Sequence, residues 1–108
     1  MHLEFLESVS FADRVDDNQG LGASIVDLIQ NAPNAGIAIC PGIWELTITY
    51  LGQHYALIHG RKGNRVSLMY IFYLPDEEHA LEKQKMEIKK LRCPTMTEGT
   101  QPKKRSKR

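Results

Sequence analysis

Three titratable side chains in the middle of this chain could move a proton. Glu45 lies in the alternating run IWELTITY, where it shares one strand face with two threonines. His54 and His59 stand at the two ends of the next segment, HYALIH, and histidine titrates near neutral pH. Because their separation is odd, the two histidines cannot lie on the same face of one strand. Glu45, His54 and His59 are therefore the candidates for general acid and base, although a surface glutamate is more often simply solvated.

The basic residues gather late in the sequence. Residues 1–60 carry one basic residue against seven acidic ones, a net charge of −6, whereas residues 83–108 carry ten against two, a net charge of +8. A phosphate-binding surface must therefore draw on the hairpin GRKGN and the C-terminal third. The candidate RNA- and phosphate-binding residues are Arg61, Lys62, Arg65, Lys83, Lys85, Lys89 and Lys90. The alternative is that the basic end of the chain only favours solubility.

Aromatic side chains could add base stacking to such a surface. Tyr55, Tyr70 and Tyr73 all fall in predicted strands, where a ring exposed on the sheet could stack on a nucleobase. A strand tyrosine is more often part of the core or of the sheet surface, so the sequence does not choose among the three.

Metal and cofactor chemistry are not indicated. Cys40 and Cys93 lie 53 positions apart and the four histidines show no ligand spacing, so no metal site is predicted. No glycine-rich phosphate loop or nucleophile elbow is present, and no small-molecule cofactor is expected. Free thiols and a cytoplasmic location are expected, because no signal peptide is evident. No membrane association is expected, because no apolar run approaches the ~20 residues that span a bilayer.

The elements that must position these residues are predicted from hydrophobic period and turn residues. Apolar positions at i, i+4, i+7 and i+8 (Leu21, Ile25, Leu28, Ile29) predict a helix over residues 21–32. Strands are predicted within 2–11 and over 43–50, 54–59 and 65–73, a loop or frayed turn over 13–20, a turn over 39–42, and a second helix over 77–92 with Leu81, Gln84, Ile88 and Leu91 on its apolar face. The order β–α–β–β–β–α predicts an α+β domain at residues 1–92, with a small, mostly antiparallel sheet packed against helices. Residues 93–108 are expected to form a disordered basic tail.

The order and residue motifs of these segments resemble those of the RelE/ParE superfamily of toxins from type II toxin–antitoxin systems, the HigB-like and RelE-like members in particular. The resemblance rests on FLESVSF, DLIQNAPNAGIAICPGIWELTI, QHYALIH and NRVSLMYIFY, which together cover about residues 3–92. It implies the RelE/ParE-like fold, a ribosome-dependent endoribonuclease (mRNA interferase) that cuts messenger RNA, and a cognate antitoxin protein as partner. No membrane partner and no cofactor follow from it.

The match fails at the residues that carry the family chemistry. Where relatives have an Arg-Lys-x-Arg pattern on the first long strand, this chain has Trp44, Glu45 and Thr47; Ala56 replaces the arginine of the second strand, and Leu74 falls near the last cation. Each lost transition-state charge typically costs about 100-fold or more in rate. In this resemblance Glu45 could serve as the base, as a glutamate does in the YoeB branch, and His54 or His59 as acid or base, as histidines do in some HigB-like members.

Two functions remain open at this stage. The first is a toxin acting on ribosome-bound mRNA with a weak or atypical catalytic set. The second is a catalytically inactive RelE/ParE-fold module that inhibits or binds a protein partner, either in the manner of ParE-like members or as a phage or host interaction protein. The acidic first 60 residues favour the second, because a surface of net −6 repels RNA.

Overall fold

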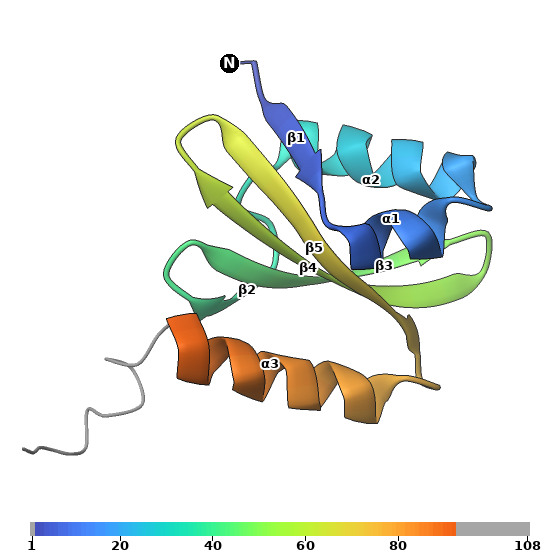
Figure 1. Ribbon diagram of the computed structural model, residues 1–108. Helices are drawn as coiled ribbons and strands as arrows, with labels where there is room; N and C mark the ends of the chain where they lie inside the picture. Colours follow the sequence, from blue (N-terminus) through green and yellow to red (C-terminus); the bar gives the residue numbers. More distant parts are fainter. Residues whose placement is uncertain (1, 93–108) are drawn as a thin grey trace, which may run out of the picture.

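The computed structural model describes residues 2–92, and the tail expected to be disordered (93–108) lies outside the described residues. A five-stranded sheet in the order β1-β5-β4-β3-β2 carries helices on both faces (Figure 1). The strands are β1 (Glu4–Glu7), β2 (Ile37–Cys40), β3 (Ile43–Tyr50), β4 (Gln53–Lys62) and β5 (Arg65–Leu74), and the helices are α1 (Val9–Val15), α2 (Gln19–Asn31) and α3 (Glu78–Arg92). The predicted α+β class is confirmed. The sheet is mixed, since β1 pairs parallel to β5 while the other three pairings are antiparallel.

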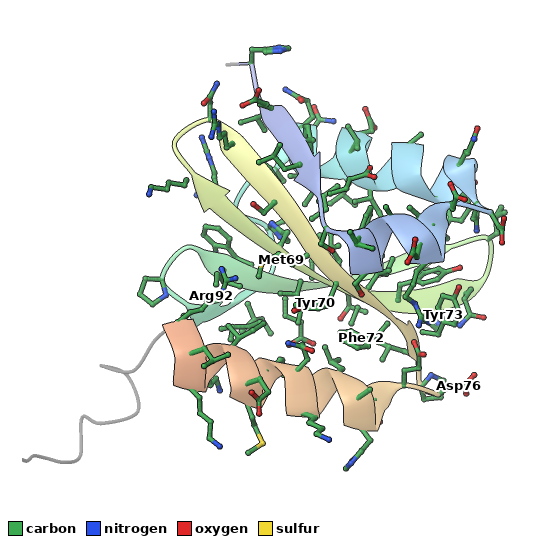
Figure 2. All side chains as sticks on the ribbon, in the orientation of Figure 1. Met69, Tyr70, Phe72, Tyr73, Asp76 and Arg92 are labelled. Carbon is green, nitrogen blue, oxygen red and sulfur yellow. The ribbon has the colours of Figure 1, made fainter. Side chains whose placement is uncertain are left out.

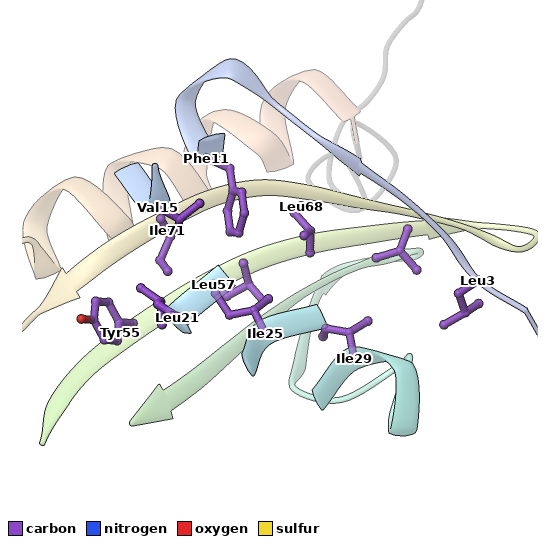
Figure 3. Packing of buried hydrophobic residues seen from close by; sticks show 11 residues of the cluster. Leu3, Phe11, Val15, Leu21, Ile25, Ile29, Tyr55, Leu57, Leu68 and Ile71 are labelled. Atoms are coloured by element: carbon purple, nitrogen blue, oxygen red, sulfur yellow. The ribbon is translucent and has the colours of Figure 1, made fainter. Parts of the chain in front are cut away.

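The sheet separates two hydrophobic cores. In β4, Tyr55 and Leu57 pack with α1 and α2, whereas Ala56 and Ile58 pack on the α3 side. This alternation is the period of two expected of a strand buried on both faces. In the first core, side chains from α1, α2 and the central strands meet between the layers (Figure 3).

Helix α2 follows its predicted apolar stripe with one exception. Leu21, Ile25 and Ile29 are buried, while Leu28 is 38% exposed. The three buried residues recur at i, i+4 and i+8, which is a stripe narrow enough for contact with a single sheet face.

Helix α3 follows its predicted apolar face except at Leu91. Leu81 and Ile88 are buried, but Leu91 is 76% exposed. Lys85 lies on the inner side, with its Nζ 2.8 Å from Glu45 Oε1. The residues that face the sheet are thus spaced i, i+4 and i+7, and the lysine remains compatible with this face because a carboxylate meets it there.

Two short elements were not predicted. The opening strand ends at Glu7, because the Ser8 side chain accepts a hydrogen bond from the Phe11 backbone N–H and caps α1. The residues before Pro41 form the edge strand β2, where a turn was predicted. Its pairing with β3 is irregular between Ala38 and Cys40.

The two long hairpins have tight turns. Leu51 and Gly52 join β3 to β4 with φ of 51° and 80°, and positive φ at both central residues is typical of a type I′ turn. Gly63, with φ of 64°, stands first in the two-residue turn between Lys62 and Arg65. The hairpin predicted at GRKGN is confirmed, but its loop is shorter than predicted, because residues 60–62 continue β4 and only Gly63 and Asn64 form the turn. The strand pairing next to this turn fixes the face of the sheet on which each basic side chain lies.

Cys40 differs from its predicted state. It is disulfide-bonded, so the expectation of a free thiol is wrong for this residue. Disulfides persist mainly in oxidising environments, and this bond therefore does not support the expected cytoplasmic location. Within residues 2–92, no helix has the length and apolar character needed to cross a membrane.

Candidate nucleic-acid interface

A cationic pocket of about 530 Å³ opens on the α3 side of the sheet, beside the β4–β5 hairpin. It is lined by Leu6, Ser8, Pro41, Gly42, Ile43, Gly60, Arg61, Lys62, Arg65, Ser67, Met69, Tyr70 and Arg92. Four of these residues are basic and none is acidic. Arg92, Met69 and Tyr70 are labelled in Figure 2, where Arg92 lies at the C-terminal end of α3.

Strand alternation decides which basic side chains face the pocket. Val66 packs in the α1–α2 core, so its neighbour Arg65 lies on the opposite face, toward the pocket. Lys62 pairs with Arg65 and shares its face, whereas Arg61 pairs with Val66. The pocket therefore receives the side chains of Lys62 and Arg65 from the hairpin.

Arg61 was predicted as a phosphate contact, but its guanidinium points away from the pocket. Its Nε donates to the Gly63 carbonyl at 2.9 Å, and Nη1 lies 3.4 Å from Asn34 Oδ1. These contacts join the β4–β5 hairpin to the loop that follows α2, on the α1–α2 side of the sheet.

A β-bulge forms the floor of the pocket. The β4–β5 register shifts between Ile58 and His59, so Met69 is an extra residue on β5 and packs on the α3 side together with Tyr70. The Ser8 hydroxyl donates to the Met69 carbonyl, which meets the hydrogen-bonding need of the backbone at the bulge. Two consecutive side chains thus face the same way, a feature that the alternating pattern of the sequence did not reveal.

Tyr70 is the one predicted stacking residue that reaches this pocket. Its ring is half-buried and stacks on Phe72, with centroids 6.3 Å apart. Tyr55 is buried in the α1–α2 core, and the ring of Tyr73 lies under the Arg14 guanidinium at 4.5 Å. Tyr70 is therefore the candidate for contact with a nucleobase.

The charges around the pocket are weakly neutralised. Arg65 Nε lies 3.0 Å from Glu4 Oε1, but both side chains are more than half exposed, and exposed pairs of this kind contribute little. Among residues 2–92, no acidic side chain pairs with Lys62 or Arg92. A phosphate entering the pocket would therefore meet a positive rim over an apolar floor.

The four helix lysines predicted to bind phosphate do not line this pocket. Lys83, Lys89 and Lys90 are exposed on α3. Lys85 is held by Glu45 and Glu82, at 2.8 and 2.9 Å. Burial lowers the pKa of Lys85, but the hydrogen bonds and charges of the two glutamates outweigh burial and raise the pKa above its usual value. Lys85 is therefore charged and already engaged.

The structure does not bring the three catalytic candidates together. Glu45 lies under α3 in contact with Lys85. His54 lies on the same sheet face, but it pairs with Thr49, four residues along β3, which places it roughly 13 Å from Glu45. The Nδ1 of His54 lies 2.9 Å from Thr49 Oγ1 at the exposed end of the hairpin. A base and an acid this far apart cannot act on one phosphodiester.

His59 is enclosed on the opposite face. It is fully buried, stacks on Trp44 with centroids 5.6 Å apart, and donates from Nε2 to the Ala35 carbonyl at 2.9 Å. Its Nδ1 has no hydrogen-bond partner within residues 2–92. Burial lowers the pKa of His59, partly opposed by the Ala35 hydrogen bond. The expectation that the two histidines occupy different faces is confirmed.

Arg92 is the pocket residue that sequence reasoning missed. It stands four positions after the buried Ile88, so both lie on the sheet-facing side of α3. This spacing was visible in the sequence.

Comparisons with known proteins add no further constraint. No protein-family model matches the chain, and neither a curated protein nor a solved structure is significantly similar to it. Within the described residues, no group of three or more His, Cys, Asp or Glu side chains could hold a metal ion.

Proposed function

We propose that this protein is a RelE/HigB-like toxin of a type II toxin–antitoxin pair that engages ribosome-bound mRNA through the cationic pocket. The observation that carries the proposal is the pocket itself: a basic rim without an acidic lining residue, over a floor that includes the half-buried ring of Tyr70. Single-stranded RNA is bound by such a combination of cations for phosphates and an aromatic face for a base. A cognate antitoxin protein is the expected partner.

In this proposal the protein acts on the message mainly by binding, and any cleavage is slow. Glu45 is bonded to Lys85, and the two histidines lie elsewhere. A fast phosphodiester transfer needs an acid, a base and a cation converging on one phosphate. Glu45 could accept a proton only after Lys85 has moved away.

The test measures binding of a short single-stranded RNA by fluorescence anisotropy over a range of salt concentrations. Replacing Lys62 and Arg92 together with glutamine should weaken binding and reduce the salt slope by about 1.4, as expected when two single-strand phosphate contacts are lost. The matched control replaces Lys83 and Lys89, which removes the same charge from the exposed side of α3. Equal losses in the two double variants would contradict a specific role for the pocket.

Tyr70 provides a second and independent test. Tyr70→Ala should weaken RNA binding by about 1–3 kcal/mol, the usual contribution of one stacked base. Tyr70→Phe keeps the ring and should retain most of the affinity. If the alanine variant binds as well as the wild type, no base stacks at this position.

A catalytically inactive binding module for a protein partner is the second candidate. It is favoured by the separation of Glu45, His54 and His59, which leaves no shared reaction centre. Induced expression in bacteria, with growth and messenger cleavage followed together, distinguishes the two. Growth arrest with cleavage within codons supports the toxin that acts on mRNA. Arrest with intact message, combined with unchanged growth arrest in the Lys62 and Arg92 double variant, supports the protein-binding module.

A further inference from the structure

A second hollow lies on the other side of the molecule, between α1 and α2. It has a volume of about 620 Å³, and none of its lining residues is basic. We call this hollow the acidic groove, since Glu7, Asp16 and Asp27 are its charged lining residues. Val15 and Val26 contribute to an apolar floor between them.

The three carboxylates are not neutralised within residues 2–92. No lysine or arginine of this part of the chain pairs with Glu7, Asp16 or Asp27, although Glu4, Glu45 and Glu77 each pair with a cation. A groove with an acidic rim and an apolar floor suits lysine and arginine side chains. Their alkyl stems can cover the valines while their charged ends reach the carboxylates.

We propose that the acidic groove holds the basic end of the same chain, residues 103–108. This segment, KKRSKR, has five basic residues among six and no acidic one. The pairing accounts for the charge asymmetry of the sequence, in which the first 60 residues carry −6 and the last 26 carry +8. This inference goes beyond the proposed function and does not depend on it.

The two hollows adjoin at the edge strand β1. Leu6 and Ser8 line the cationic pocket together with Arg92, whereas Glu7, between them, lines the acidic groove. The two hollows are therefore separated only by the edge strand β1 and the start of α1. Lys103 lies eleven positions after Arg92, and a chain of eleven steps can span at most roughly 36–40 Å. An intramolecular segment of this length reaches a high effective concentration at a nearby site.

Carbodiimide cross-linking of the full chain tests this placement, because the reagent joins a lysine amine to a carboxylate without a spacer. Mass spectrometry of the digested product should find Lys103, Lys104 and Lys107 joined to Glu7, Asp16 and Asp27. Raising the salt concentration to about 1 M, where the Debye length is about 3 Å, should suppress these products. Cross-links spread evenly over all exposed carboxylates would overturn the proposal.

Two variants and one labelling experiment complete the test. Asp16→Asn with Asp27→Asn should lower the yield of cross-links to Glu7 by about two- to tenfold, as two exposed ion pairs are lost. Asp13→Asn with Asp17→Asn removes two exposed carboxylates that do not line the groove, and should leave the Glu7 yield unchanged. Mixing ¹⁴N- and ¹⁵N-labelled protein before cross-linking should give unmixed isotope pairs. Mixed pairs would show a segment from a second copy and overturn the intramolecular arrangement.

Discussion

The two faces of the sheet differ in how they are covered. The α1–α2 face is covered by two helices that bury Phe11 and the stripe of α2, and its hollow is acidic. The other face is covered by one helix, α3, which buries only Leu81 and Ile88 and relies on Lys85 for a further contact with the sheet. Its hollow is cationic and opens directly onto the strands. The thinly covered face is thus the one where a large anionic ligand can reach the sheet.

The largest predicted effects come from removing one buried side chain from each face of the sheet. Phe11→Ala should lower the free energy of unfolding by about 3–5 kcal/mol, because the ring is fully buried in the larger core. Leu81→Ala should cost about 2–4 kcal/mol, because its site lies under a single helix that can partly close the cavity. Urea denaturation measures both variants.

Hydrogen exchange separates the two packing effects further. The Leu81 variant should speed exchange in α3 while α2 keeps its protection, whereas the Phe11 variant should lower protection throughout. Val9→Ala, at a position that is 77% exposed, is the control and should change stability by about 0.5 kcal/mol or less. Equal loss of protection in α2 and α3 for both core variants would mean that the two faces unfold as one unit.

The same contrast shows what the sequence could reveal about the fold. The α2 stripe, the long strands and the hairpin were predictable, because each follows a regular period or ends at glycine. Helix α1 was missed because residues 9–11 continue the apolar pattern of the opening strand, and the start of the helix is marked only by the hydrogen bond from the Phe11 N–H to the Ser8 side chain. Edge strand β2 was missed because only four residues form it, next to Pro41. Local patterns do not contain the tertiary pairing that stabilises such short elements.

The site was predictable in part. Lys62 and Arg65 were found from the clustering of charge, and strand parity correctly separated His54 from His59. Arg61 was predicted with Lys62 and Arg65 as a phosphate contact, because a charge pattern does not show on which face of a strand a side chain lies. The Met69 bulge was also not predictable, since an extra residue in one strand is defined only by its partner strand.

A smaller effect is expected at the ion pair that supports α3. Glu45→Gln should lower the free energy of unfolding by about 1–2 kcal/mol, because Lys85 would keep a largely buried charge with one partner fewer. Glu82→Gln should cost about 0.5 kcal/mol or less, since Glu82 is 60% exposed. Glu87→Gln, on the exposed side of α3, serves as the control. Thermal unfolding that ranks the three variants in any other order would contradict a structural role for Glu45.

The smallest predicted effect is the contribution of His59, on the α1–α2 face of the sheet, to the pH dependence of the free energy of unfolding. The Ala35 carbonyl can only accept, so the proton of neutral His59 is on Nε2, and a second proton on Nδ1 would be buried without an acceptor. Burial therefore holds the pKa of His59 below its usual value near 6.5. As the pH falls below 6.5, the unfolded chain takes up a proton before the folded protein does, so stability decreases with falling pH. Between pH 7.5 and 5.5 this residue should lower the free energy of unfolding by no more than about 1.4 kcal/mol, the limit set by protonation of the unfolded chain.

Urea denaturation of His59→Gln at the two pH values isolates this contribution. The glutamine amide can still donate to the Ala35 carbonyl but does not titrate, so the variant should lose less stability than the wild type on going to pH 5.5. His79→Gln, at an exposed position of α3, should keep the full pH dependence of the wild type. If His59→Gln and the wild type lose the same stability between pH 7.5 and 5.5, His59 is not protonated on unfolding in this range. The burial of His59 on the α1–α2 face then does not contribute to the pH dependence of stability.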